Sequence, residues 1–197
     1  SGPESFTPDT NTLLGEVPEI KNFFVCCGLN SIGIGSGGGV GKVTAEWLIN
    51  GHINEDIFSY DIKRFQKFHS ELGFIKERIT ETLGDLYGMH WPFKQHKTSR
   101  DLKLTPYHEE MKKAGACFGV TGGYERPMWY ATNGQKPEYE YSYNYQNWYP
   151  AAEYETKNTR ENVGLFDLTA FSKYDLKGKN VHFELQKLCT ANIKNEP

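Results

Sequence analysis

Seven glycines fall within the fourteen residues 28–41, and this run constrains the fold more than any other feature of the sequence. The run follows a short apolar segment, residues 22–27, which is typical of a buried strand. It precedes a segment with one apolar helical stripe from Val40 to Trp47 and a C-terminal stop signal at Gly51. The expected unit is therefore a strand, a glycine-rich turn and a helix.

Within the run, Gly33, Gly35 and Gly38 have the G-x-G-x-x-G spacing of dinucleotide-binding loops. Glycines there let backbone N–H groups approach a phosphate or a ring carbonyl beside the positive end of a helix. The spacing alone is not specific, and Glu55 and Asp56 are predicted in a loop rather than at the end of a second strand. Three alternatives stay open: a nucleotide or flavin contact loop, a Rossmann fingerprint, and a structural turn.

Composition excludes several classes of protein. The chain has 197 residues, enough for one large domain or two small ones. Its 22 Lys and Arg residues are scattered among 25 Asp and Glu residues, whereas a nucleic-acid binder needs a basic stripe. No apolar run approaches the length of a membrane helix, so no membrane span is expected. The first residues predict neither a signal peptide nor a transit peptide.

Cysteines and histidines give no signal for a metal site or a disulfide framework. The four cysteines have no C-x-x-C spacing, and the six histidines form no H-E-x-x-H pattern. We therefore expect no metal and a reduced, soluble, intracellular protein. The adjacent Cys26 and Cys27 are expected to pack within the apolar strand.

Periodicity in the rest of the chain predicts a mixed α+β protein. Helical spacing is found at residues 61–87 with a break at Gly73, at 107–114, at 151–162 and at 181–188. Tyrosines that alternate with polar residues over 139–145 predict a strand, and residues 164–169 and 171–176 predict two strands around a bend.

Asp167 is an acid within an apolar run, residues 165–168. A buried carboxylate needs hydrogen-bond partners or a function. The residues alone leave two roles equally open, a cap for the backbone and a contact to a ligand.

Several stretches, taken in order along the chain, resemble the sarcosine and dimethylglycine dehydrogenase family. Four stretches resemble the C-terminal part of the flavin domain of that family: PESFTPD at 3–9, GLNS at 28–31, GGGVGK at 37–42 and DIKRF at 61–65. Two further stretches resemble its linker domain, residues 110–119 and GYERP at 123–127. The start of the folate-binding aminomethyltransferase domain, shared with the glycine-cleavage T-protein, is resembled by VGLFDLT at 163–169 and FSKY at 171–174.

This resemblance implies a division into three parts and an interior segment of a longer enzyme. Residues 1–66 would be the C-terminal part of an FAD-dependent oxidoreductase domain, 67–127 a linker domain, and 128–197 the N-terminal part of the aminomethyltransferase domain. The implied enzyme oxidatively demethylates an N-methylglycine, sarcosine or dimethylglycine, and passes the one-carbon unit to tetrahydrofolate. The segment alone would be inactive.

The same resemblance implies FAD and tetrahydrofolate as cofactors, an N-methylated glycine as substrate, and an electron acceptor as partner. The expected location is the bacterial cytoplasm or the mitochondrial matrix. Two alternatives stay open. One is a non-catalytic regulatory homologue, as in the regulatory subunit of pyruvate dehydrogenase phosphatase, and the other is an unrelated Rossmann nucleotide-binding protein.

Candidate site residues follow from the resemblance. The residues expected to contact FAD are Gly28, Leu29, Asn30, Ser31, Ile32, Gly33, Ile34, Gly38, Gly39 and Lys42. A helix N-terminus near residues 39–41, together with Lys42, would stabilise the negative charge of the reduced flavin. The residues expected to contact tetrahydrofolate are Asp167, Leu168 and Thr169, with Asp167 as the catalytic residue that assists proton transfer.

Overall fold

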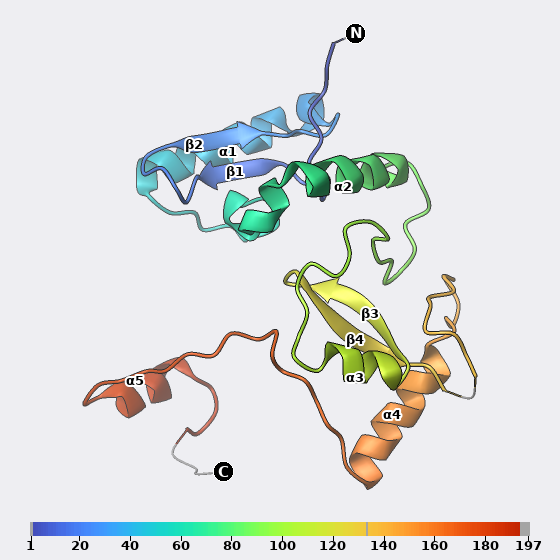
Figure 1. The fold of residues 1–197 in the computed structure, drawn as a ribbon. Helices are drawn as coiled ribbons and strands as arrows, with labels where there is room; N and C mark the ends of the chain where they lie inside the picture. The colour runs from blue at the N-terminus through green and yellow to red at the C-terminus, as the bar shows by residue number, and fades with distance from the viewer. Residues whose placement is uncertain (1, 133, 194–197) are drawn as a thin grey trace.

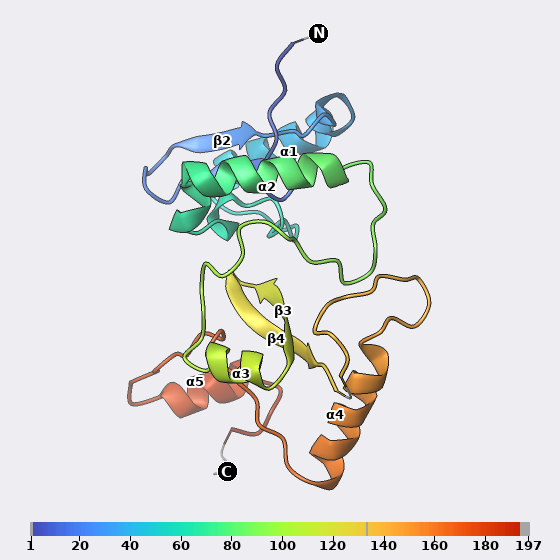
Figure 2. The same ribbon diagram turned by 45° about the vertical axis from the view of Figure 1, so that its right-hand side comes forward.

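A computed structural model describes residues 2–132 and 134–193. Its two sheets each have two antiparallel strands, and helices pack beside both (Figures 1 and 2). The elements in chain order are β1 (Leu13–Glu16), β2 (Phe24–Cys27), α1 (Gly33–Asn50), η1 (Ile62–Arg64), η2 (Lys67–Ser70), α2 (Leu72–Asp85), α3 (His108–Lys113), β3 (Ala116–Thr121), β4 (Tyr124–Tyr130), α4 (Tyr149–Glu161) and α5 (Val181–Leu188).

The first sheet is held to α1 by a tryptophan that packs over a glycine. Gly15 in β1 has φ of 107°, and an added Cβ would lie 2.6 Å from Cη2 of Trp47 in α1. The Trp47 ring also meets the Phe24 ring of β2 edge to face, with centroids 5.9 Å apart. The α1 stripe predicted from the sequence therefore reaches the sheet through Trp47.

We expect Gly15→Ala to destabilise the chain by about 1–3 kcal/mol, because the new methyl group overpacks the contact and forces alanine into the left-handed region. Denaturant unfolding followed by circular dichroism measures this change. Gly41→Ala is the matched control, since a Cβ at Gly41 meets nothing within 4 Å. A control that loses as much stability as Gly15→Ala would contradict the Trp47 explanation.

Buried polar contacts tie the N-terminal segment to later parts of the chain. The guanidinium group of Arg64 donates to Asp9 from Nε at 2.7 Å and from Nη2 at 3.0 Å. The buried side chain of Asn30 accepts the Thr7 N–H at 2.9 Å and donates to the Gly28 carbonyl at 2.6 Å. These contacts fix the residues before β1 against the loop that leads into α1.

The second sheet carries the main core of the molecule. β3 and β4 pair antiparallel with an irregularity between Cys117 and Phe118, and α3 and α4 pack beside them. Cys117, Trp129 and Ala151 form the buried cluster at this sheet. The segment before α3 is fixed to β4, because Arg100 pairs with Glu125 and the Lys103 carbonyl accepts the Glu125 N–H at 2.9 Å.

Several elements predicted from the sequence are confirmed. They are the strand that ends at Cys27 and the helices now seen as α1, α3, α4 and α5. Cys26 and Cys27 are exposed, so their predicted packing in a buried strand is wrong for the described chain. Gly73 lies in the first turn of α2 rather than between two helices, and two short 3-10 helices precede it.

Three predicted strands are wrong. Residues 139–145 and the two segments within 164–176 form no strand, because none of them has a partner with which to form a ladder in the described ranges. The alternating tyrosines instead pack on the loop before them. The Tyr139 and Tyr141 rings stack at 5.5 Å, and the Tyr143 hydroxyl donates to the His90 carbonyl at 3.1 Å. No described helix is long and apolar enough to cross a membrane.

Candidate functional site

Six of the seven glycines of the run, from Gly33 to Gly41, lie in a helix rather than in a loop. α1 begins at Gly33, so the helix N-terminus predicted near residues 39–41 lies two turns earlier. Glycine spacing misled the prediction because glycine has a low helix propensity, and the pattern alone does not show that residues 33–41 are helical. The Rossmann fingerprint is also wrong, since the preceding strand β2 belongs to a two-stranded antiparallel sheet.

The loop between β2 and α1 is tightly organised. Gly28, Asn30 and Ser31 all have positive φ, at 66°, 46° and 66°. The Asn30 amide is already used by Thr7 and Gly28, and the Ser31 hydroxyl donates to the carboxylate of Glu4. These two side chains therefore hold the loop in shape, while Leu29 is half-buried and Ile32 is exposed.

α1 presents a bare backbone surface. An added Cβ would meet no atom within 4 Å at Gly35, Gly37, Gly38, Gly39 or Gly41. Ile34 at the start of the helix is fully exposed, and Lys42 forms only an i,i+4 ion pair with Glu46 at 3.7 Å. Each exposed glycine costs a helix about 1 kcal/mol relative to alanine. Nothing in the described chain compensates for that cost, so these glycines fit a surface that a flat ligand approaches closely.

The three residues predicted to contact folate line one pocket. It has a volume of about 720 Å³ and lies between α3, the end of β4 and residues 165–173. Asp167, Leu168 and Thr169 form part of its wall, together with Tyr107 and Met111. The sequence pattern alone did not reveal Tyr107, Met111 or Tyr130 as pocket residues, because they belong to segments far apart in the chain.

Asp167 caps the backbone through one carboxylate oxygen. Its Oδ1 accepts the Thr169 N–H at 2.9 Å. Its Oδ2 is shielded from solvent and has no partner at ordinary hydrogen-bond geometry. The hydroxyl of the buried Thr105 also has no such partner, but it lies close enough to the Asp167 carboxylate to affect its pKa. Burial opposes ionisation of Asp167, but Thr105, Thr169 and the charge of Lys173 outweigh it and lower the pKa of the carboxyl.

The capping role of Asp167 is thus confirmed, and its role in ligand binding stays a prediction. The structure does not bring the two predicted sets of site residues together. α1 lies at one end of the molecule, whereas the pocket beside α3 lies at the other end (Figures 1 and 2).

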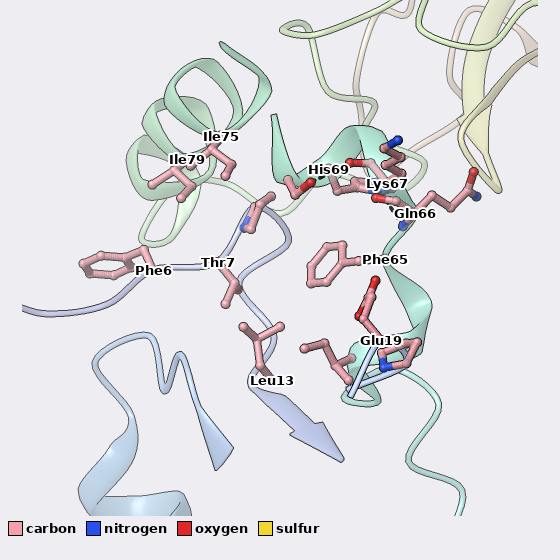
Figure 3. A pocket seen from close by; sticks show the side chains of 14 residues that line it. Phe6, Thr7, Leu13, Glu19, Phe65, Gln66, Lys67, His69, Ile75 and Ile79 are labelled. Atoms are coloured by element: carbon pink, nitrogen blue, oxygen red, sulfur yellow. Dashed lines mark hydrogen bonds between the residues drawn. The ribbon is translucent and has the colours of Figure 1, made fainter. Parts of the chain in front are cut away.

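A further pocket, which the sequence did not predict, lies under β1. Figure 3 shows it between Leu13, Phe65 and the α2 residues Ile75 and Ile79, and its volume is about 760 Å³. His69 in its wall stacks on Phe68 with centroids 3.9 Å apart, and burial lowers the pKa of this imidazole. A neutral histidine in an apolar wall adds no charge with which to bind an ionic ligand. In the described ranges no cluster of three metal-ligating side chains occurs at this pocket or elsewhere.

Comparison with known proteins divides the chain into two regions. Residues 50–105 match the family model of the FAD dependent oxidoreductase central domain. Residues 107–197 match the family model of the GCVT N-terminal domain. The chain thus joins parts of a flavin-dependent oxidoreductase and of a GCVT-type protein. The three-part division after residues 66 and 127 stays a prediction.

Three relatives extend this finding. The chain is 42% identical over its full length to 4-methylaminobutanoate oxidase (formaldehyde-forming) of Paenarthrobacter nicotinovorans, and 40% identical over 72% of its length to human mitochondrial sarcosine dehydrogenase. It is 30% identical over 88% of its length to the mouse mitochondrial pyruvate dehydrogenase phosphatase regulatory subunit. It covers 24%, 16% and 20% of these proteins.

The two matched family models and the relative named sarcosine dehydrogenase confirm the resemblance to the sarcosine and dimethylglycine dehydrogenase family that the sequence showed. They also exclude the alternative of an unrelated Rossmann nucleotide-binding protein.

Proposed function

We propose that this chain forms one wall of the flavin site and one wall of the folate site of an FAD-dependent N-methyl amino acid dehydrogenase. The observation that carries the flavin part is the group of Gly35, Gly38 and Gly39, which share one face of α1 at i, i+3 and i+4 and have no neighbour within 4 Å. The names of two relatives, an oxidase of 4-methylaminobutanoate and a dehydrogenase of sarcosine, support an N-methyl amino acid as substrate. Sarcosine or dimethylglycine is the finer proposal.

Each site has a stated chemical task. FAD, when bound, accepts a hydride from the N-methyl carbon, and tetrahydrofolate accepts the one-carbon unit. The residues proposed to lie against FAD are Gly28, Leu29, Asn30, Ser31, Ile32, Gly33, Ile34, Gly38, Gly39 and Lys42. Their part is to exclude water and to allow close backbone approach. The N–H groups of the first turn of α1 lack acceptors within the helix, so they can face the negative charge that develops on the ring.

The folate part rests on the 720 Å³ pocket. Asp167, Leu168 and Thr169 lie in its wall, and the lowered pKa keeps Asp167 ionised at neutral pH. An ionised carboxylate accepts hydrogen bonds from ring N–H groups and can take up a proton during transfer. The proposed location is the bacterial cytoplasm or the mitochondrial matrix, in line with the bacterial and mitochondrial relatives.

In the holoenzyme that contains this chain, we expect Asp167→Asn to separate the two halves of the reaction. Amine oxidation, measured as dye reduction without folate, should stay near wild type. Methylene-tetrahydrofolate formation should fall about tenfold or more, because a hydrogen bond to a charged group is worth about 1.5–3 kcal/mol. Free formaldehyde should rise in proportion.

Asp175→Asn is the control, because Asp175 is exposed and pairs only with Lys177 at 2.8 Å. It should leave both assays unchanged. A collapse of dye reduction in Asp167→Asn with an intact flavin spectrum would instead assign Asp167 to the oxidation site.

A second candidate is a regulatory homologue without catalysis, favoured by the 30% identity to a phosphatase regulatory subunit. Anaerobic addition of N-methyl amino acids to the flavin-loaded protein distinguishes the two. Bleaching of the flavin absorbance supports the dehydrogenase, and an unchanged spectrum with every N-methyl amino acid tested supports the regulatory homologue.

A further inference from the structure

We propose that Arg126 binds a carboxylate, namely the anionic tail of the ligand whose ring system occupies the 720 Å³ pocket. This inference rests on the proposed folate site and deepens it. It assigns a second, polar subsite to that site and centres it on Arg126, which neither the family resemblance nor the pattern of the sequence picked out as a binding residue.

The subsite is a smaller pocket that adjoins the larger one. Its volume is about 360 Å³, and it shares Tyr130 and residues 165–168 with the larger pocket. Arg126 on β4 lines it together with Asn158 and Thr159 of α4. A ligand that crosses the shared wall would therefore contact an apolar region at one end and polar side chains at the other.

The guanidinium group of Arg126 has donors that the described chain leaves unused. Its Nε is shielded from solvent and has no hydrogen-bond partner. Its Cζ lies 4.8 Å from the centroid of the Phe171 ring, a contact that orients the planar group but supplies no acceptor. The carboxylates in the same wall accept from the backbone through one oxygen each, because Glu155 Oε1 accepts the Tyr130 N–H and Asp167 Oδ1 accepts the Thr169 N–H. Asp167 Oδ2 has no hydrogen-bond partner, and neither carboxylate forms a hydrogen bond or an ion pair with Arg126 in the described ranges.

Other cations of the molecule differ from Arg126 in this respect. Arg64, Arg78 and Arg100 each donate to carbonyl or carboxylate oxygens within the described ranges. Lys173, the cation in the wall of the larger pocket, donates to the Leu168 carbonyl at 2.6 Å and to the Thr169 carbonyl at 3.1 Å. Among the described cations that line the two pockets, Arg126 is the one with a shielded donor that has no acceptor.

A carboxylate is the acceptor that best suits this group. The guanidinium fork matches the two oxygens of a carboxylate, and the pair is strengthened by its charge. A reduced folate has a flat ring at one end and the carboxylates of glutamate at the other. The larger apolar pocket with Asp167 suits the ring, and the smaller pocket with Arg126 suits the glutamate.

The test compares two ligands on the holoenzyme that contains this chain. Tetrahydrofolate has the glutamate tail, and 6-methyltetrahydropterin lacks it. We expect Arg126→Gln to weaken binding of tetrahydrofolate about tenfold or more by calorimetry and to leave binding of 6-methyltetrahydropterin unchanged. Arg126→Lys, which keeps the charge and loses the fork, should fall between wild type and Arg126→Gln. Arg160→Gln, on the exposed side of α4, should bind both ligands as wild type does.

A measurement on the unmodified protein keeps the inference testable if Arg126→Gln fails to fold. p-Aminobenzoylglutamate should then compete with tetrahydrofolate, whereas p-aminobenzamide should not. Equal competition by the two, or equal loss of both pterin ligands in Arg126→Gln, overturns the carboxylate subsite.

A different set of results would overturn the proposed folate site itself. If Asp167→Asn and Arg126→Gln both bind tetrahydrofolate as wild type does, the two pockets are not the folate site, and the subsite is overturned with it. If Asp167→Asn loses binding of both pterin ligands while Arg126→Gln loses neither, the folate site stands and only the carboxylate subsite is overturned.

Discussion

Glu125→Ala is expected to destabilise the chain by about 3–5 kcal/mol, because it removes one partner of a buried ion pair. The Glu125 side chain is 1% exposed and accepts from Arg100 Nε at 2.7 Å and from the Asp101 N–H at 2.9 Å. Without Glu125, the half-buried guanidinium group of Arg100 has no counter-charge. Denaturant unfolding measures the loss. Glu110→Ala is the control, since the Glu110–Lys113 pair is exposed and should contribute little.

The same pair has a predictable dependence on pH. Burial alone would raise the pKa of Glu125, but Arg100 and the Asp101 N–H outweigh it and hold the pKa below its ordinary value of 4.5. A carboxyl with a depressed folded-state pKa stabilises the fold above its unfolded-state pKa, and the stabilisation is lost as the pH falls through the folded-state value. The stability gap between wild type and Glu125→Gln should therefore narrow below about pH 4.5. A gap that stays constant from neutral pH to pH 3 would contradict this role of the charge.

Gly38→Val is expected to remove FAD from the holoenzyme while leaving this chain folded. A Cβ at Gly38 meets no atom within 4 Å, so the chain itself has room for the side chain. The branched side chain would instead occupy the space that the proposed flavin needs. The ratio of flavin absorbance to protein absorbance measures retention, and the melting temperature of the flavin-free protein checks the fold.

Lys42→Ala provides the comparison. Lys42 lies in the middle of α1, is exposed and pairs with Glu46 at 3.7 Å. Such an i,i+4 pair is worth about 0.3–0.5 kcal/mol, so this variant should keep most of its flavin and lose activity only mildly. Equal loss of flavin from both variants would contradict the proposal that the bare backbone of α1 faces the ring. A melting temperature that falls sharply in Gly38→Val without flavin would contradict it as well.

Elements that bury one face or carry their own end signals could be predicted from the sequence. α3 has acids in its first turn and lysines in its last, and α4 begins with a proline, as helices often do. The start of α1 could not be predicted, because residues 33–39 include five glycines, which disfavour a helix locally. The alternation of tyrosines from Tyr139 to Tyr145 also led to a wrong prediction of a strand. Alternation is typical of one face of a strand, but it does not show whether a second strand is present to pair with it.

The residues of the candidate sites also divide into those that local sequence patterns predict and those that they do not. Asp167 was found because it is an acid in an apolar run within a familiar motif. Arg126 and Tyr130 were missed because the pockets are assembled from β4, α4 and residues 165–168, and no local pattern records that assembly. The glycines of α1 were found as a group, although their secondary structure was not.

The contacts before α3 bear on how such proteins can exchange parts during evolution. The two family matches meet between Thr105 and Tyr107, yet Arg100 and Lys103 are bonded to Glu125, and the Thr105 hydroxyl helps to lower the pKa of Asp167. Recombination at the border of the two matches would separate Glu125 from its counter-charge and Asp167 from one of its polar neighbours. We therefore expect an exchange of the GCVT region to be tolerated better when residues 100–105 are carried along with it.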